Sequence, residues 1–421
     1  MKFDDNELYS IPSSVNGTQC SLHDLAKWKN GLAFKKINFS DEGVPVIKIS
    51  ELNNGIGPKT AYTKEIFSED VHLKRGDLLF SWSGNPQTSI DTFRFDLEEG
   101  WLNQHIFKLT PNEKLVDFDY FYFLMKNLKP YFTKIATNKQ TTGLGHVTLA
   151  DIKRMNLIVP DVETQKRIVS VIKPIDDKIK LNNDINKNLL QQIQLLCRSW
   201  LVDYAPFGYE QPATWSVVPL SSIADFISGY SYKGSELVES DIAMATIKNF
   251  DRKGGFKLDG YKEVQPSAKL KPEQHAELFD TLVAHTDLTQ NAEVIGNAEP
   301  VLSLSGYKDI VFSMDVVKVL PKEGISKFLL AALLRDGRFK AHAMGYVNGT
   351  TVLHLSKKAL PEFELPLPSD LGELAPLADT VESMYRQIAN NIDESTQLAK
   401  LRDSLLPRLM SGELDVSDID I

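Results

Sequence analysis

Apolar residues between Ile168 and Trp200 follow the spacing of one long amphipathic helix. They recur at alternating steps of four and three, which keeps one face of a helix against a partner. The positions on this face are Ile168, Ile172, Ile175, Ile179, Asn182, Asn186, Leu189, Ile193, Leu196 and Trp200. The two asparagines keep the register but make its centre polar. Such a helix would measure roughly 50 Å, at a rise of about 1.5 Å per residue.

The same face returns near the end of the chain, at a shift of 209 residues. Its positions are Leu377, Val381, Met384, Ile388, Asn391, Ser395, Leu398, Leu405 and Leu409. Arg402 interrupts this face, and Leu401 beside it is expected to cover the gap. We expect the two helices to pair as an antiparallel coiled coil whose polar centres meet, because amides that bond across a seam fix its register. The alternative is that the polar positions are solvated breaks.

The segments before each helix also repeat. Residues 21–35 return as 219–233, and this pattern predicts a short helix ended by a glycine, Gly31 or Gly229. Strand-like and helix-like segments then recur in the same order, with a shift that drifts only from 198 to 210. We therefore expect an α+β fold built from two duplicated α/β globules, each followed by a long helix. The expected domains are 1–160, the helix 161–205, 206–368, and the helix and acidic tail 369–421.

Composition narrows the class of protein. At 421 residues and 42% hydrophobic content, the chain suits two or three soluble domains. It has no apolar run of the roughly 20 residues needed to span a membrane. Cys20 and Cys197 are its only cysteines, which fits the cytoplasm and provides neither a disulfide framework nor a zinc cluster. Of the net charge of −9, residues 369–421 contribute −7, so the globules are close to neutral and can carry local basic surfaces.

The chain contains a spacing that superficially fits a metal-dependent nuclease, in which Asp161 is followed by Asp176, Asp177 and Lys178. Such sites bring carboxylates together on adjoining strands, whereas here the second group lies within the predicted long helix. We find no P-loop, dinucleotide fingerprint or histidine metal pair. We therefore expect no catalytic residue, no metal and no cofactor. His105, His146, His285 and His354 lie in the globules and are expected to be structural or DNA-facing.

Polar loops between the apolar strands carry side chains that can read DNA. Amides can bond bidentately to adenine, Arg and Lys can bond to guanine, and hydroxyl groups bond to phosphate. The candidates are Lys35, Trp82, Asn85, Gln87, Asn103, Gln104, Lys139, Gln140, Thr141, Thr142, Tyr232, Lys233, Lys248, Asn249, Arg252, Lys253, Asn348, Thr350 and Thr351. Polar loops occur in many proteins, however, and a lysine after a helix-ending glycine has an ordinary surface role as well.

The whole pattern resembles the specificity (S) subunit of type I DNA restriction–modification systems, the HsdS family. The resemblance covers nearly the whole chain, and the segments that carry it are 30–34, 44–52, 76–80, 146–148, 158–168 and the C-terminal 405–414. The second half departs from the pattern at 373–377 and at Phe279.

The resemblance implies a non-catalytic subunit whose two globules, as target-recognition domains, each read half of a split double-stranded DNA site. The paired helices would set their separation. It further implies two methyltransferase (M) subunits, which use S-adenosylmethionine, and restriction (R) motor–nuclease subunits as partners. Two other hypotheses remain open, namely a coiled-coil adaptor without sequence-specific DNA reading and a catalytic nuclease or methyltransferase.

Overall fold

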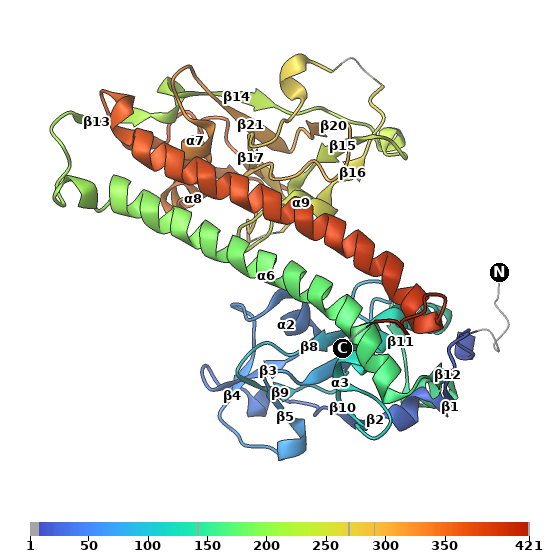
Figure 1. Ribbon diagram of the computed structural model, residues 1–421. Coiled ribbons are helices and arrows are strands. Elements are labelled where there is room, and N and C mark those ends of the chain that lie inside the picture. Colours follow the sequence, from blue (N-terminus) through green and yellow to red (C-terminus); the bar gives the residue numbers. More distant parts are fainter. Residues whose placement is uncertain (1–7, 141–142, 268–269, 290, 420–421) are drawn as a thin grey trace. The chain divides into compact units, whose positions relative to one another are not determined.

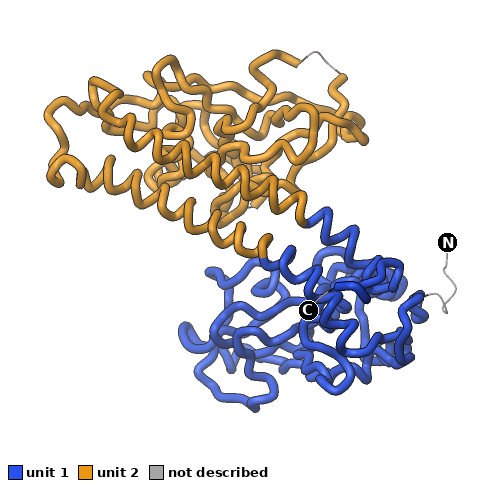
Figure 2. Tube along the Cα trace, in the orientation of Figure 1, with its two compact units in different colours: residues 1–177, 399–421 blue, residues 178–398 orange. Residues whose placement is uncertain are grey.

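The computed structural model describes residues 8–140, 143–267, 270–289 and 291–419. The chain divides into two compact units (Figure 2), of which unit 1 comprises Met1–Asp177 and Ala399–Ile421, and unit 2 comprises Lys178–Leu398. Each unit thus combines one globule with the adjoining segments of both long helices, α6 (Val162–Leu201) and α9 (Ala375–Ser411). No helix in the described part of the chain is long and apolar enough to cross a membrane.

Unit 1 contains two four-stranded sheets, with strand orders β2-β10-β6-β8 and β4-β3-β9-β5. The first is antiparallel throughout, and the second contains one parallel pair, β3 with β9. Its strands are β1 (Thr18–Ser21), β2 (Ala26–Asn30), β3 (Val44–Ile47), β4 (Tyr62–Thr63), β5 (His72–Lys74), β6 (Leu78–Ser81), β7 (Ser83–Gly84), β8 (Asp91–Arg94), β9 (Glu99–Leu102), β10 (Ile106–Pro111), β11 (Gly145–His146) and β12 (Asn156–Val159).

Helices pack against both sheets of unit 1. They are α2 (Ile49–Asn54), α3 (Phe118–Asn127), α4 (Lys129–Asn138) and α5 (Leu149–Arg154), with the short 3-10 turns η1 (Leu22–Leu25), η2 (Lys36–Asn38) and η3 (Glu69–Val71). Of these, α2 lies beside the second sheet, and α3 and α4 lie against the first. Asp117 caps α3 by accepting hydrogen bonds from the backbone N–H groups of Asp119 and Tyr120. Phe80 on β6, Phe121 on α3 and Phe132 on α4 are buried in the same core, to which α6 and α9 also contribute.

Unit 2 repeats this plan, with the strand order β14-β21-β17-β19 in place of β2-β10-β6-β8. A parallel pair, β15 with β20, likewise follows the plan of β3 with β9. Its strands are β13 (Trp215–Pro219), β14 (Ala224–Ser228), β15 (Ile242–Ala245), β16 (Lys262–Glu263), β17 (Thr281–Ala284), β18 (Thr286–Asp287), β19 (Ala298–Pro300), β20 (Asp309–Phe312), β21 (Val316–Pro321), β22 (Val347–Asn348), β23 (Leu353–Leu355) and β24 (Glu364–Pro368). The expected duplication of α/β globules is confirmed.

The helix pair of unit 2 corresponds to α3 and α4 of unit 1. The pair consists of α7 (Lys327–Leu334) and α8 (Gly337–Met344), and the unit also has the short turns η4 (Ala205–Phe207), η5 (Leu220–Ser222), η6 (Gly234–Glu236), η7 (Ile247–Asn249), η8 (Leu258–Gly260), η9 (Pro272–Gln274) and η10 (Leu371–Leu374). Phe328, Phe339 and Tyr385 are buried in a core that joins α7, α8 and α9. Figure 1 labels α7, α8 and α9.

The segment at residues 21–35 differs from the expectation of a short helix ended by glycine. Only one 3-10 turn forms, and the chain then continues as β2, which pairs with β10. Gly31 does not end a helix. Glycine is required there because a Cβ would lie 2.2 Å from the Asn103 carbonyl oxygen. The corresponding Gly229 stands against the Ser313 carbonyl in the same way. The helix prediction is wrong because cross-strand pairing outweighs the local pattern.

Contacts between α6 and α9 run in antiparallel order within each unit. In unit 2, Asn391 Nδ2 donates to Asn186 Oδ1 at 2.8 Å, and Asn182 Nδ2 donates to Ser395 Oγ at 3.2 Å. The polar centres therefore meet, and Asn182, Asn186 and Asn391 are buried, so these positions are not solvated breaks; Asn182 is 0% exposed. A coiled coil in the strict sense, with side chains of one helix in holes of the other, stays a prediction.

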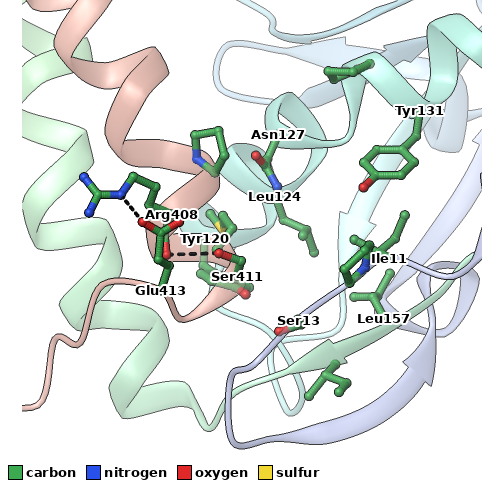
Figure 3. A pocket seen from close by; sticks show the side chains of 15 residues that line it. Ile11, Ser13, Tyr120, Leu124, Asn127, Tyr131, Leu157, Arg408, Ser411 and Glu413 are labelled. Carbon is green, nitrogen blue, oxygen red and sulfur yellow. Dashed lines mark hydrogen bonds and ion pairs between the residues drawn. The ribbon is translucent and has the colours of Figure 1, made fainter.

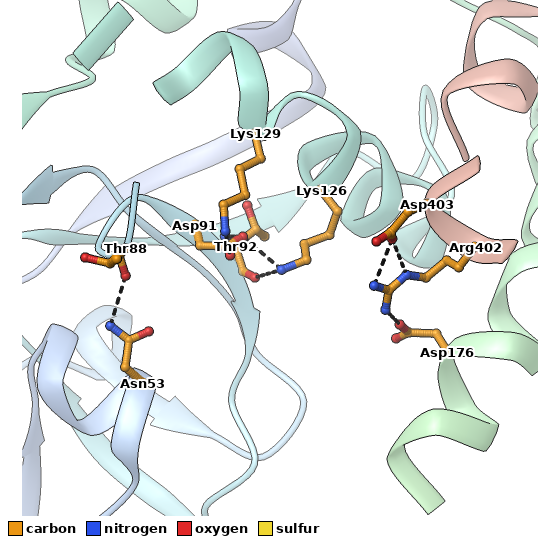
Figure 4. A network of polar contacts seen from close by, with 9 residues as sticks. All are labelled: Asn53, Thr88, Asp91, Thr92, Lys126, Lys129, Asp176, Arg402 and Asp403. Carbon is orange, nitrogen blue, oxygen red and sulfur yellow. Dashed lines mark hydrogen bonds and ion pairs between the residues drawn. The ribbon is translucent and has the colours of Figure 1, made fainter. Parts of the chain in front are cut away.

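Arg402, which interrupts the apolar face of α9, forms an ion pair with α6. In unit 1, Arg402 on α9 donates to Asp176 on α6 at 2.7 Å and to Asp403 at 2.9 Å (Figure 4). Leu401 does not cover the gap, since it is 48% exposed. The ion pair replaces the apolar contact that the pattern would have placed there.

Candidate nucleic-acid interface

In unit 1, aromatic and amide side chains converge where several strands end. Asn30, at the end of β2, accepts a hydrogen bond from Trp82 Nε1 at 3.0 Å. The Trp82 ring lies 5.4 Å from the His105 ring and 6.0 Å from the His146 ring, measured between centroids. Gln104 Nε2 is 3.2 Å from His105 Nε2. We call these five residues the unit 1 polar cluster.

Backbone pairing assembles this cluster from distant parts of the chain. The Trp82 N–H donates to the His105 carbonyl at 3.2 Å, and the Val147 N–H donates to the Trp82 carbonyl at 2.9 Å. His146 Nδ1 lies 2.9 Å from Ser83 Oγ. Burial, with a further contribution from His146, lowers the pKa of His105 and so favours its neutral form. The cluster therefore offers hydrogen-bond donors and acceptors together with aromatic rings, which suits contacts to base edges.

Unit 2 has a cluster at the corresponding place, made of different side chains. The His285 N–H donates to the Asp315 carbonyl at 2.8 Å, as Trp82 does to His105. Thr286 Oγ1 donates to Asp315 Oδ1 at 3.1 Å, and His354 pairs with Thr286 across β18 and β23. Burial and the neighbouring His354 lower the pKa of His285. The same position thus carries tryptophan and two histidines in one unit, and two histidines and an aspartate in the other.

Most of the polar candidates from the sequence lie at the surface. The exposed ones are Lys35, Asn85, Gln87, Lys139, Gln140, Lys233, Lys248, Arg252, Lys253, Asn348, Thr350 and Thr351. The partly buried ones are Trp82, Asn103, Gln104 and Tyr232. Thr141 and Thr142 lie outside the described residues. Contact of any of these with DNA stays a prediction.

Some of the candidates already have structural partners. Asn249 is completely buried, and its amide accepts from the Thr246 N–H at 2.8 Å and donates to the Lys257 carbonyl at 2.8 Å. Contrary to the expectation of a base contact, it shapes its loop from inside. Lys139 forms an ion pair with the buried Asp151. Burial raises the pKa of Asp151, but the hydrogen bonds, chiefly from Lys139, lower it more.

The histidines at 105, 146, 285 and 354 belong to these clusters, although the sequence shows them only as scattered residues. The available signal is that His146 and His354 occupy corresponding places in the duplication. Asn30 had no signal of its own, because its partner Trp82 is distant along the chain. Sequence reasoning therefore found the loops but not their convergence.

The residues of the metal-site spacing have structural partners, and a cavity in unit 1 is mainly apolar. Asp161 caps α6 by accepting from the Thr164 N–H at 2.9 Å, and Asp176 binds Arg402. Within the described ranges, no group of three His, Cys, Asp or Glu side chains is placed to hold a metal ion. A cavity of about 300 Å³ in unit 1 is lined mainly by apolar side chains of α3, β12 and the end of α9 (Figure 3). Arg408 and Glu413 at its edge form an ion pair at 2.6 Å.

Comparisons with known proteins agree with this architecture. Residues 17–191 match the family described as Type I restriction modification DNA specificity domain. The type I restriction enzyme MjaVIII specificity subunit of Methanocaldococcus jannaschii is 24% identical over 389 residues, which cover 89% of this chain and 87% of the relative. The HindI specificity subunit of Haemophilus influenzae is 25% identical over 417 residues, covering 81% of this chain and 87% of that protein.

A solved structure has the same fold. The S subunit of the type I restriction–modification system from M. genitalium superposes with a TM-score of 0.51 at 15% identity, covering 94% of this chain and 96% of that one. The matched domain lies in the first globule and α6, and the relatives extend over both globules. The chain thus contains a segment that matches the type I restriction modification DNA specificity domain, and most of its length is similar to type I restriction enzyme specificity subunits.

Proposed function

We propose that this chain recognises a bipartite double-stranded DNA site, one half through unit 1 and the other through unit 2. The observation that carries the proposal is the repetition of one sheet plan with different polar side chains at the corresponding place. Trp82, His105 and His146 in unit 1 stand where His285, Asp315 and His354 stand in unit 2. Two similar scaffolds with different polar groups suit the reading of two different base sequences.

We further propose that catalysis belongs to partner proteins. The relatives are named specificity subunits of type I restriction enzymes. By analogy, two methyltransferase subunits and the restriction subunits would assemble with this chain in the cytoplasm. The acidic segment 369–421, which carries a charge of −7, would repel phosphate and is better suited to protein contacts than to DNA. In this proposal the chain selects the site and the partners modify or cut the DNA.

An exchange of recognition segments tests the proposal. Residues 1–155 would be replaced by the matching segment of a relative with a different target, and the purified chains would select sequences from a pool of random duplexes. The wild type should enrich a two-part sequence, and the chimera should change one part and keep the other. The reciprocal exchange of residues 206–368 should change only the other part.

The chimera needs a control for folding, because α9 contributes to the core of unit 1. Leu406 and Leu409 are buried there with Ile168, so the donor segment should preserve the side chains around them. The thermal unfolding midpoint of the chimera should match that of the wild type. A coiled-coil adaptor would enrich no sequence at all. A chimera that folds but changes both parts of the target would contradict separate reading by the two units.

A further inference from the structure

In unit 2, a lysine of α8 organises the loop between β18 and β19. Lys340 Nζ lies 3.2 Å from the Glu293 carbonyl and 2.9 Å from Asn297 Oδ1, and it also bonds to the Ile295 carbonyl. Another part of this loop closes on itself, since Asp287 accepts hydrogen bonds from the Thr289 and Val294 N–H groups. We call Lys340 with its acceptors the unit 2 clamp.

The unit 2 clamp extends to a second loop that carries candidate DNA contacts. Asn297 Nδ2 donates to the Asp251 carbonyl at 2.8 Å, so one amide joins Lys340 to the loop 251–255. Glu299, which is 2% exposed, accepts from the Gly255 N–H at 2.6 Å and also binds Arg335. Lys340 and Arg335 thus connect α7 and α8 to both loops through Asn297 and Glu299. The exposed Arg252 lies on one of them.

Unit 1 holds the corresponding loop in a similar way (Figure 4). Lys126 Nζ donates to Asp91 Oδ1 at 2.8 Å, and Lys129 Nζ donates to Asp91 Oδ2 at 2.5 Å. We call these three residues the unit 1 clamp. Burial alone would raise the pKa of Asp91, but the two ammonium groups, Lys126 above all, lower it more. Asn53 Nδ2 donates to the Thr88 carbonyl at 3.4 Å and fixes the middle of the same loop.

The two clamps act on the same structural position. Asp91 is the first residue of β8 and lies opposite Ser81 on β6. Asn297 immediately precedes β19, and its carbonyl accepts from the Ala284 N–H at 3.0 Å on β17. In each unit, the lysines come from the helix pair that follows the sheet, α3 with α4 or α7 with α8. The lysine positions differ between the units, yet the residue that ends the loop is bound by an ammonium group in both.

We propose that these clamps are positioning residues that determine specificity: they hold the loop segments 84–91 and 291–297 in the conformation that reads bases, without contacting DNA themselves. The inference rests on the proposed function. A loop held before binding loses less conformational freedom when it meets its correct site, which favours that site over others. Asn85, Gln87 and Asn291 are exposed on these loops and would make the contacts. Lys340 has a pKa lowered to about 8 by burial, with Asp287 opposing, so it keeps its charge below that pH.

The test compares Lys340→Met with the double variant Lys126→Met/Lys129→Met in full-length protein. Selection from random duplexes would report each half-site separately. Lys340→Met should reduce discrimination in the half-site read by unit 2 by about tenfold or more, roughly the effect of one base pair. The unit 1 variant should do the same only in the other half. Lys358→Met and Lys114→Met, at exposed surface positions, serve as matched controls.

Two further measurements separate positioning from other roles. Removing a lysine that contacts phosphate directly would reduce, by about one, the slope of the logarithm of the binding constant against the logarithm of the salt concentration. The clamp variants should instead keep the wild-type slope and the wild-type affinity for non-specific duplex. Lys340→Arg, which can still donate to the same carbonyls, should restore discrimination. Equal discrimination in wild type and Lys340→Met, a reduced slope, or damage to both half-sites would overturn the inference. Failure of the wild type to enrich any sequence would instead overturn the proposed function, and the inference with it.

Discussion

The paired asparagines of unit 2 allow a quantitative test of how α6 and α9 recognise each other. Asn186 and Asn391 are 8% and 5% exposed, and the amide of Asn391 donates to Asn186 Oδ1 at 2.8 Å. Leucine has a similar size and no polar atoms. The perturbation is therefore Asn186→Leu and Asn391→Leu, made singly and together.

The structure determines the expected magnitudes. Each single leucine leaves the other amide buried without its partner, which costs about 1–3 kcal/mol. Independent effects would then sum to about 2–6 kcal/mol in the double variant. Replacing both partners by apolar groups of similar shape is instead nearly neutral, so we expect the double variant within about 1 kcal/mol of the wild type.

Hydrogen exchange measured by mass spectrometry provides the assay. Peptides from residues 178–201 and 375–398 report the local opening of the helix pair in unit 2, and peptides from unit 1 are the internal control. A tenfold change in the opening equilibrium corresponds to about 1.4 kcal/mol. Single variants whose costs add within the ordinary scatter of about 0.5 kcal/mol would refute the reasoning. The asparagines would then contribute independently, and not as a pair.

Three further predictions follow from other contacts. Hydrogen bonds from Ser267 and the backbone lower the pKa of Glu236 from 4.5 to about 2. The ionised carboxylate therefore stabilises the fold fully above pH 4.5, and this stabilisation is lost as the pH falls toward 2. The difference in urea midpoint between wild type and Glu236→Gln should shrink over that pH range. Gly31→Ala should destabilise unit 1 by about 1–3 kcal/mol in urea unfolding, because its Cβ would lie 2.2 Å from the Asn103 oxygen, whereas Gly234→Ala, with open space around it, should stay within about 0.5 kcal/mol. Four residues inserted after Asn186 lengthen α6 by roughly 6 Å and should add at least one base pair between unchanged half-sites in the selected DNA, if the helices measure the spacing; an unchanged spacer with binding retained would show that they do not.

The long helices and the duplication could be predicted because they depend on regular periods along the chain. An apolar residue every three or four positions is favourable only when one helix face is buried, so the face is visible without coordinates. The polar interruption at Asn182 and Asn186 was visible for the same reason. Its partners follow from the repeat, which places Asn391 at the matching position.

Other features depended on contacts between distant residues. The segment 26–30 alternates apolar and polar residues over only five positions, and it is a strand because β10 supplies its hydrogen bonds. Lys139 is a residue type that can contact phosphate, but its ammonium group forms an ion pair with Asp151. Asn249 likewise has both ends of its amide taken by backbone groups. In each case, the residue type shows what chemistry is possible, and the neighbours determine which part of it is available.

At the candidate site, too, local sequence determines some features and contacts between distant residues determine others. Residue types along the chain identified polar loops that could read DNA, since exposure and hydrogen-bonding capacity are properties of each segment. The convergence of Trp82 with His105 and His146, and the binding of Asp91 by Lys126, join segments far apart in the sequence. Local periodicity reports which face of a segment is buried, but it carries no information about which distant side chain will satisfy a given polar group. That choice is made only when the sheets and helices pack.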